Sequence, residues 1–209
     1  MKILLIGSGN INTLISDMYK ELVVGMVDNK NENIKDIPTV LIDFSHHSLL
    51  DKTISFALKY NIPVVIGTTG YDKEKMAQIK ELSKTTPVLM CQNFSESMMF
   101  IKNFLSSNLN FFELYKKSII ERHSIDKKDN PSGTALMLSE VLKTNEITSF
   151  REPFFVAEHE IVFENDDEII TIKHKVLNRK IFAIGAVEAA RKIINKHSGL
   201  YAYEDIFYE

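Results

Sequence analysis

The first ninety residues alternate short apolar runs with amphipathic segments, and this alternation constrains the fold more than any other feature. The first apolar run is followed by apolar residues at spacings of three and four, the period of an amphipathic helix: Ile11, Leu14, Ile15, Met18 and Leu22. Helical stretches also follow the third and fourth runs. The runs cover residues 2–7, 22–27, 39–44, 63–66 and 87–91. Such alternation predicts a parallel sheet with right-handed crossovers and a ligand site outside the carboxyl ends of its strands.

The pattern changes after about residue 95 and predicts a second domain with a different architecture. Helices and β-rich runs that no longer alternate strictly are typical of an α+β domain. We expect helices over 95–112 and 132–144, and strands over 118–121, 158–163 and 168–176. A last helix is expected over 182–194, and periodicity alone assigns it to neither domain.

Composition and charge exclude several classes of partner. The 209 residues carry a formal net charge of -3 and no basic stripe, so a nucleic-acid-binding role is not expected. The apolar run at the start is too short for a signal sequence or a membrane span. The single cysteine, Cys91, cannot form an intramolecular disulfide or a thiolate cluster, which suits a reducing cytosol. We therefore expect a cytoplasmic protein without a nucleic-acid or membrane partner.

The turn after the first apolar run carries part of a dinucleotide-binding fingerprint. Backbone N–H groups and the positive end of a helix at this position can hold a pyrophosphate. The third glycine of the fingerprint is missing, and asparagines stand where small residues are expected. A plain tight turn is therefore equally compatible with the motif taken alone. The turn consists of Gly7, Ser8, Gly9, Asn10, Ile11 and Asn12.

Two further motifs follow predicted strands. Asp28 ends the second run, where a carboxylate can accept hydrogen bonds from the adenine ribose hydroxyls. This favours NADH, although Lys30 nearby would tolerate the 2′-phosphate of NADPH. Gly67-Thr68-Thr69-Gly70 follows the fourth run, and its glycines and hydroxyls suit a nicotinamide ring. The alternatives are a solvated acid at a strand end and a loop with an N-cap threonine.

The segment from Glu121 to Ala135 is the most informative part of the chain. It places a histidine and lysines before a Pro-Ser-Gly-Thr turn that opens a predicted helix, a natural site for an anion. We expect Thr134 and the free N–H groups of the first helical turn to bind one carboxylate. Lys127 would lie beside a second carboxylate or protonate an imine nitrogen. A histidine titrates near neutral pH, so His123 is the first candidate for the proton donor. The alternative is a charged surface loop.

Other histidines and acids carry no predicted role. His46 and His47 are interpreted as exposed loop residues. The Glu158-His159-Glu160 trio resembles a metal site only superficially, because alternate residues of a strand point to opposite faces. The acids near His123 lack ligand spacing as well, so no metal site is expected. Residues 165–168 are predicted to form a hairpin turn.

Taken together, the motifs resemble the dihydrodipicolinate reductase family over nearly the whole chain. The resemblance implies NAD(P)H-dependent reduction of 4-hydroxy-tetrahydrodipicolinate to tetrahydrodipicolinate in the diaminopimelate route to lysine. It implies an α/β fold, with a Rossmann-type parallel-sheet domain over residues 1–94 with 186–209. An α+β domain for substrate binding and oligomerisation covers residues 95–185. The segments that carry the resemblance are Asp43-Phe44-Ser45, Gly67-Thr68-Thr69-Gly70, Asn93-Phe94-Ser95, His123 to Ala135, Ala157-Glu158-His159-Glu160, Phe182-Ala183-Ile184-Gly185-Ala186 and Gly199-Leu200-Tyr201.

The resemblance also implies roles for individual residues. His123 would be the acid and Lys127 the catalytic lysine. The substrate would be a small dicarboxylate, bound by Ser124, Ser132, Gly133 and Thr134. The cofactor would be NADH or NADPH, with NADH favoured, and the chain would assemble as a homotetramer or a homodimer. The implied cofactor contacts are the turn from Gly7 to Asn12, Asp28, Gly67, Thr68, Thr69, Cys91, Gln92, Asn93 and Phe94.

Three departures from the family pattern bear on function. The family has two adjacent histidines where this chain has His123 followed by Ser124, so weaker substrate binding is expected. Between Leu142 and Arg151 the chain is much shorter than family members, in a region that contributes to the tetramer, which keeps a dimer as an alternative. The incomplete glycine turn bears on how tightly the cofactor binds.

Two other functions compete with this interpretation. A related amino-acid dehydrogenase, such as an aspartate dehydrogenase, shares the Rossmann start, but the Lys-x-x-x-Pro-Ser-Gly-Thr block argues against it. A nucleotide-binding regulatory module without catalysis would account for the missing glycine and histidine. The presence of both His123 and Lys127 argues for catalysis instead.

Overall fold

The structure, a computed structural model, describes residues 1–208, so that Glu209, the last residue of the expected first domain, lies outside it. The chain divides into two compact units. One comprises Met1–Phe94 and the stretch from Phe182 to the C-terminus, and the other comprises Ser95–Ile181. Nearly the whole last helix therefore belongs to the first unit. Within residues 1–208, no helix is long and apolar enough to cross a membrane.

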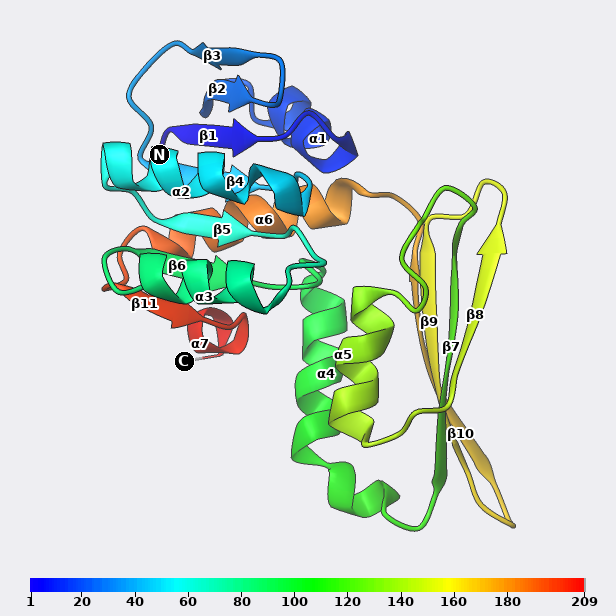
Figure 1. The fold of residues 1–209 in the computed structure, drawn as a ribbon. Helices are drawn as coiled ribbons and strands as arrows, with labels where there is room; N and C mark the ends of the chain where they lie inside the picture. The colour runs from blue at the N-terminus through cyan, green and yellow to red at the C-terminus, as the bar shows by residue number, and fades with distance from the viewer. Residues whose placement is uncertain (209) are drawn as a thin grey trace. The chain divides into compact units, whose positions relative to one another are not determined.

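The first unit is built around a seven-stranded sheet with the strand order β11-β6-β5-β4-β1-β2-β3 (Figure 1). All neighbouring strands are parallel except β2 and β3, which are antiparallel. The expected parallel sheet is confirmed. The edge strands β3 and β11 are each three residues long, too short for the pattern to predict. The strands are β1 (Ile3–Ile6), β2 (Val23–Val27), β3 (Glu32–Ile34), β4 (Val40–Asp43), β5 (Val64–Ile66), β6 (Pro87–Met90) and β11 (Gly199–Tyr201).

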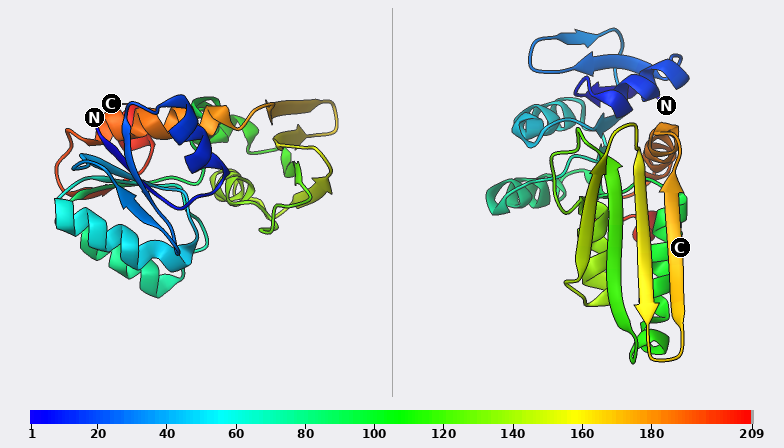
Figure 2. Two further views of the ribbon diagram at one scale, coloured as in Figure 1. Left: turned by 90° about the horizontal axis from the view of Figure 1, so that it is seen from above. Right: turned by 90° about the vertical axis from the view of Figure 1, so that its right-hand side faces the viewer.

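Helices cover both faces of this sheet. In Figures 1 and 2, α2 and α3 lie on one face and α1 and α6 on the other. Local chemistry sets their ends: Asp72 accepts the N–H of Lys75 at the start of α3, and Asn61 ends α2 in the left-handed conformation. The helices are α1 (Asn10–Met18), the 3-10 helix η1 (His47–Leu49), α2 (Leu50–Tyr60), α3 (Lys73–Leu82), α6 (Lys180–Ile193) and α7 (Glu204–Phe207).

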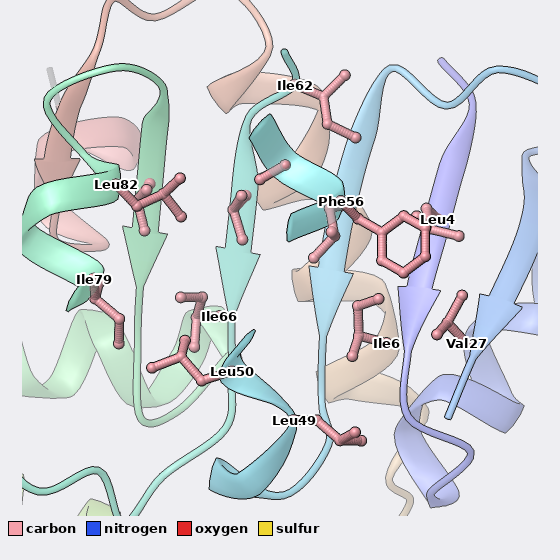
Figure 3. Close-up of a cluster of buried hydrophobic side chains, with 14 residues drawn as sticks. Leu4, Ile6, Val27, Leu49, Leu50, Phe56, Ile62, Ile66, Ile79 and Leu82 are labelled. Atoms are coloured by element: carbon pink, nitrogen blue, oxygen red, sulfur yellow. The ribbon is translucent and has the colours of Figure 1, made fainter. Parts of the chain in front are cut away.

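A continuous cluster of buried side chains fills the space between the sheet and α2 and α3 (Figure 3). Alternate residues of a strand point to opposite faces, so Leu4 and Ile6 of β1 belong to this cluster. Ile3 and Leu5 are buried as well, on the other face. Because both faces are covered, the central strands β1, β4 and β5 are apolar apart from Asp43, which is why they stand out in the sequence. This packing holds the carboxyl ends of the strands in place.

The second unit is a four-stranded sheet with the order β10-β9-β7-β8, and α4 and α5 lie on one of its faces (Figure 2, right). β7 pairs parallel with β8 and antiparallel with β9, and β9 and β10 form an antiparallel hairpin. Asn165 closes this hairpin by accepting the N–H groups of Asp167 and Glu168, which confirms the predicted turn. The elements are α4 (Glu96–Ser107), the 3-10 helix η2 (Leu109–Phe112), β7 (Lys116–Ser124), α5 (Gly133–Leu142), β8 (Ile147–Glu152), β9 (Ala157–Glu164) and β10 (Ile169–Val176).

Strand β8 is the main element that the sequence pattern does not predict. It occupies part of the short connection after Leu142, and its register places Ser149 opposite Glu121 and Arg151 opposite His123 of β7. Polar residues on a covered face break the apolar alternation by which strands are recognised. Their burial depends on polar partners from the neighbouring strand, which is a tertiary effect.

Candidate active site

The carboxyl ends of β1 and β4 meet at the switch point of the first sheet, where the strand order reverses. The turns after the two strands touch: a Cβ on Gly7 would stand 2.7 Å from the Cβ of Ser45. Gly7 also has a φ of +96°, a conformation that favours glycine. A pocket of about 380 Å³ opens here, and its lining includes Gly7, Ser8, Gly9, Asp28, Phe44 and His46. Several of the expected cofactor contacts therefore share one pocket.

The remainder of the glycine turn forms the start of α1. Gly9 is the N-cap and provides no side-chain hydrogen bond, so the N–H groups of the first turn, which begins with Asn10 and Ile11, carry no side-chain cap. Asn12 is fully buried, and its Nδ2 donates to the carbonyl oxygens of Ile6 (2.6 Å) and Gly7 (2.8 Å). The Asn12 side chain thus braces the turn from inside.

The Asp28 carboxylate is held by its own turn at the rim of the pocket. Its Oδ1 accepts the N–H groups of Lys30 and Asn31, both at 2.8 Å. These hydrogen bonds hold the pKa of Asp28 below its usual value, so the group is anionic at neutral pH. Lys52 fastens the same turn by donating from Nζ to the Asp28 carbonyl oxygen.

A buried carboxylate to which the sequence pattern assigns no role joins the turns after β4 and β5. Asp43 accepts the hydroxyl hydrogens of Ser45 (2.6 Å), Thr53 (2.6 Å) and Thr68 (2.8 Å). Burial raises the pKa of Asp43, and these hydrogen bonds oppose the shift only in part. The Thr68 hydroxyl, expected to face a cofactor, is engaged in this network, since it also accepts the N–H of Ser45.

The other expected cofactor contacts lie at the carboxyl ends of β5 and β6, and two of them, Gly67 and Phe94, lie against the ring of Phe44. A Cβ on Gly67 would stand 2.2 Å from this ring. The ring of Phe94 meets it edge-on, with the centroids 5.1 Å apart. The buried Cys91 thiol donates to the carbonyl oxygen of Asn93. Thr69 and Gln92 are exposed in the same turns.

In the second unit, a buried polar cluster surrounds the end of β7 and is centred on Glu121. This fully buried carboxylate accepts hydrogen bonds from His123 Nε2 (3.2 Å), Ser132 N (3.1 Å), Ser149 Oγ (2.8 Å) and an Arg151 Nη (3.2 Å). Burial acts to raise the pKa of Glu121. The hydrogen bonds, with His123 the foremost donor, outweigh burial and hold that pKa well below its usual range.

His159 of β9 completes the Glu121 cluster. Its Nε2 lies 3.6 Å from Glu121 Oε2 and 3.2 Å from Ser132 Oγ, and its ring packs edge-on against His123 with the centroids 5.0 Å apart. Burial lowers the pKa of His159, against the opposing effect of Glu121. The strand register places His159 opposite Glu121, and no spacing in the sequence reveals this pairing.

The residues on either side of His159 in the sequence are not part of the Glu121 cluster, as the alternation of side chains along a strand predicts. Glu158 and Glu160 point to the opposite face of the sheet. There Glu158 pairs with Arg122 (3.0 Å) and Glu160 with Lys173 (2.8 Å). The trio of residues 158–160 is therefore not one cluster.

The turn after β7 carries Lys127, the expected catalytic lysine. Its Nζ lies 2.8 Å from Asp129 Oδ1. Burial acts to raise the pKa of Asp129, but the hydrogen bond from Lys127 outweighs it and lowers that pKa. Ser124 accepts the N–H of Asp126 and lies 3.3 Å from its carboxylate, so its hydroxyl is used within the turn.

The expected carboxylate-binding turn is the N-terminus of α5. Ser132 is the N-cap, and its Oγ accepts the N–H of Ala135 (3.2 Å). Gly133 and Thr134 begin the helix, where N–H groups and the helix dipole favour an anion. An Arg151 Nη donates to the carbonyl oxygen of Asp129 (2.6 Å) and thereby ties this turn to β8.

Donor atoms of Glu121, His123 and His159 lie within 4.8 Å of one another, close enough to surround a metal ion. The sequence shows no ligand spacing here, because the three residues come from two strands. Each donor already has a hydrogen-bond partner in the cluster, and Arg151 places a positive charge on the same carboxylate. The arrangement is that of a hydrogen-bond network.

Comparison with known proteins relates both units to one family. Residues 1–94 match the family model for the N-terminus of dihydrodipicolinate reductase, and residues 97–207 match the one for its C-terminus. The 4-hydroxy-tetrahydrodipicolinate reductase of Thermosipho africanus is 35% identical over 205 residues, which cover 96% of this chain and 94% of that protein. The enzyme of the same name from Clostridium novyi is 34% identical over 245 residues, with 98% and 97% covered.

Solved structures agree with this relationship at the level of the fold. A dipicolinate-bound dihydrodipicolinate reductase from Paenisporosarcina superposes with a TM-score of 0.75 at 20% identity, over 99% of both chains. An aspartate dehydrogenase from Thermotoga maritima superposes with a TM-score of 0.56 at 13% identity, over 94% of this chain and 98% of that one. With both of its parts matched by the family models and relatives 34–35% identical over 96–98% of its length, the chain belongs to the dihydrodipicolinate reductase family of oxidoreductases.

Proposed function

We propose that the chain reduces 4-hydroxy-tetrahydrodipicolinate to tetrahydrodipicolinate with a nicotinamide cofactor, in the diaminopimelate route to lysine. The observation that carries the residue roles is the segment from Glu121 to Ala135. It joins a buried histidine, a lysine and the N-terminus of α5 in one short stretch. Family membership supports the reaction, and the dipicolinate in the solved Paenisporosarcina relative supports a dicarboxylate substrate.

The substrate carboxylates are bound by complementary charge in the second unit. The N–H groups of Gly133 and Thr134 at the start of α5 bind one carboxylate. The ammonium of Lys127 binds the other carboxylate. The substrate must therefore compete with the Asp129 carboxylate for this ammonium. Ser124 offers a neutral hydroxyl where the family has a second histidine, so we expect weaker substrate binding from this position.

His123 supplies the proton that the reaction consumes. The cofactor, when bound, supplies a hydride to a ring carbon. The hydroxyl group leaves as water, so one proton is taken up for each hydride. A positioned histidine accelerates such a step by about 10²–10⁴-fold. Glu121, at 3.2 Å, holds the ring of this donor.

The first unit fits a dinucleotide. The pocket at the switch point, the positive φ of Gly7 and the first turn of α1 without a side-chain cap suit a pyrophosphate. Asp28 accepts the ribose hydroxyls, and its negative charge opposes a 2′-phosphate, so NADH is favoured over NADPH. The turns at residues 67–69 and 91–94 would hold the nicotinamide.

Assembly of several copies forms part of the proposal. The face of the second sheet opposite α4 and α5 carries Phe150, 44% exposed, and Ile169, 63% exposed. These two side chains lie on opposite edge strands, with the ion pairs Arg122–Glu158 and Lys173–Glu160 on the same face, so they form no continuous apolar patch, and the expected assembly rests on the family resemblance. We expect a homotetramer in the cytoplasm, with a homodimer as the alternative, and light scattering after gel filtration distinguishes the two.

The test is the oxidation of NADH, followed by its absorbance, with freshly made product of dihydrodipicolinate synthase as substrate. We expect turnover by the wild type and its loss in His123→Ala and Lys127→Ala. His197→Ala and Lys128→Ala remove an exposed histidine and an exposed lysine as matched controls and should remain active. Repeating the assay with NADPH measures the cofactor preference. A wild type that binds NADH but turns over no substrate would overturn the proposal in favour of an amino-acid dehydrogenase or a regulatory protein.

A further inference from the structure

Buried polar groups from β7, β8 and the turn before α5 meet at a single carboxylate, that of Glu121. Oxygen Oε1 of Glu121 accepts from Ser149 (2.8 Å), Ser132 (3.1 Å) and Arg151 (3.2 Å). Oxygen Oε2 faces His123 Nε2 at 3.2 Å and also accepts the Ser132 N–H, at 3.2 Å. The Ser132 N–H is therefore shared by both oxygens, whereas the donors of β8 face Oε1 and the imidazole of His123 faces Oε2.

We propose that Glu121 is the positioning residue of the active site, and that it holds the His123 ring with Nε2 inward so that Nδ1 faces the substrate. This inference rests on the proposed role of His123 as proton donor. A carboxylate only accepts hydrogen bonds, so the nitrogen that faces it carries a proton. Neutral His123 is then the Nε2–H tautomer, and the second proton, the one available for transfer, binds to Nδ1.

A carboxylate is required at position 121, because an amide there could donate to the ring. Around His123, the His159 ring packs edge-on against the imidazole, and Arg151 lies opposite it in the strand register. The first turn of α5, residues 133–136, contains no ionisable side chain. Glu121 is the carboxylate in direct contact with the ring, at 3.2 Å from Nε2, so it determines which ring nitrogen carries the proton.

A Glu121→Gln substitution keeps the size of the side chain but removes its charge. The donors around Oε1 determine how the new amide is oriented. Ser149 Oγ and an Arg151 Nη face Oε1 alone, so the amide oxygen stays there, and the shared Ser132 N–H can still donate to it. The amide NH₂ then takes the place of Oε2 and donates to His123 Nε2. That nitrogen must become the acceptor, so the neutral ring switches to the Nδ1–H tautomer.

The first experiment requires no catalysis. Long-range ¹H–¹⁵N spectra of uniformly labelled protein, recorded at a pH where the rings are neutral, report the tautomer of each histidine, and His123→Asn identifies the signal. We expect Nε2–H in the wild type and Nδ1–H in Glu121→Gln. As a matched control, Glu158→Gln removes a buried carboxylate from the opposite face of the same sheet and should leave the signal unchanged. A wild-type ring in the Nδ1–H form overturns the inference even if Glu121→Gln fails to fold.

The second experiment compares kcat at neutral pH. Glu121→Gln should reduce kcat at least about tenfold, because its amide NH₂ and a protonated Nε2 would both be donors. Glu121→Asp keeps an acceptor-only carboxylate and should keep the Nε2–H tautomer, although kcat drops because the shorter side chain reaches less far. If Glu121→Gln lowers kcat without changing the tautomer of His123, the residue is merely structural and the inference is wrong. An inactive wild type with the expected tautomers would overturn the proposed function alone.

Discussion

Gly185 in α6 is the position where a single added methyl group should disturb the first unit most. The residue is buried, and a Cβ there would stand 1.8 Å from the carbonyl oxygen of Phe94 and 2.9 Å from its carbonyl carbon. Weak C–H···O contacts begin at about 3.3 Å. The helix and the backbone at Phe94 would therefore have to separate by about 1.5 Å. A backbone atom cannot rotate out of the way.

The size of the effect follows from two opposing contributions. Overpacking of a buried site costs about 1–3 kcal/mol. Replacement of a helical glycine by alanine returns about 1 kcal/mol. Because the clash is with backbone, we expect the upper end of the first range. Gly185→Ala should thus lower the free energy of unfolding of the first unit by about 2 kcal/mol.

Urea denaturation measures this change as a shift of the midpoint at constant slope. Ile184→Ala is the matched control, since Ile184 is 43% exposed on the same helix and its truncation should change stability by about 0.5 kcal/mol at most. Phe94 lies among the proposed cofactor contacts, so Gly185→Ala should also weaken NADH binding, as a fluorescence titration would show. A Gly185→Ala protein as stable as the wild type would refute the close packing of α6 against Phe94.

Three further substitutions test other parts of the two units. Burial raises the pKa of Asp43 above its ordinary 3.8, so its contribution to stability is present below that value and is lost as the pH rises through the folded-state pKa. Asp43→Asn should therefore gain stability relative to the wild type between that value and neutral pH, and urea titrations that show a constant difference would contradict this. Ser132→Ala removes the N-cap of α5, which costs about 1 kcal/mol, and should raise KM for the substrate more than it lowers kcat. Asn12→Ala loses two buried hydrogen bonds, each worth about 1 kcal/mol, and should lower Tm, whereas Thr13→Ala loses an exposed one and should not.

The parallel sheet of the first unit could be predicted from the sequence because its strands are buried on both faces. Residues 3–6 and 40–42 are apolar without interruption, and each stretch is followed by glycine or a polar residue. The same reasoning located Gly7, Asp28 and Gly67 at the carboxyl edge, where the structure places them. The candidate site residues between His123 and Thr134 could also be predicted from the sequence, because they lie in one continuous segment of the chain.

Tertiary structure decided how the buried charges are satisfied. Glu121 and His159 are far apart in sequence, and Ser149 and Arg151 belong to a strand with no apolar alternation. Asp43 looks like an ordinary acid at the end of a strand until Thr53 and Thr68 are brought against it. A charge can be buried only where hydrogen-bond donors surround it, and those donors come from whichever segments strand register and helix packing bring together. Local patterns of hydrophobicity determine which elements form, and only the assembled fold determines which polar groups meet.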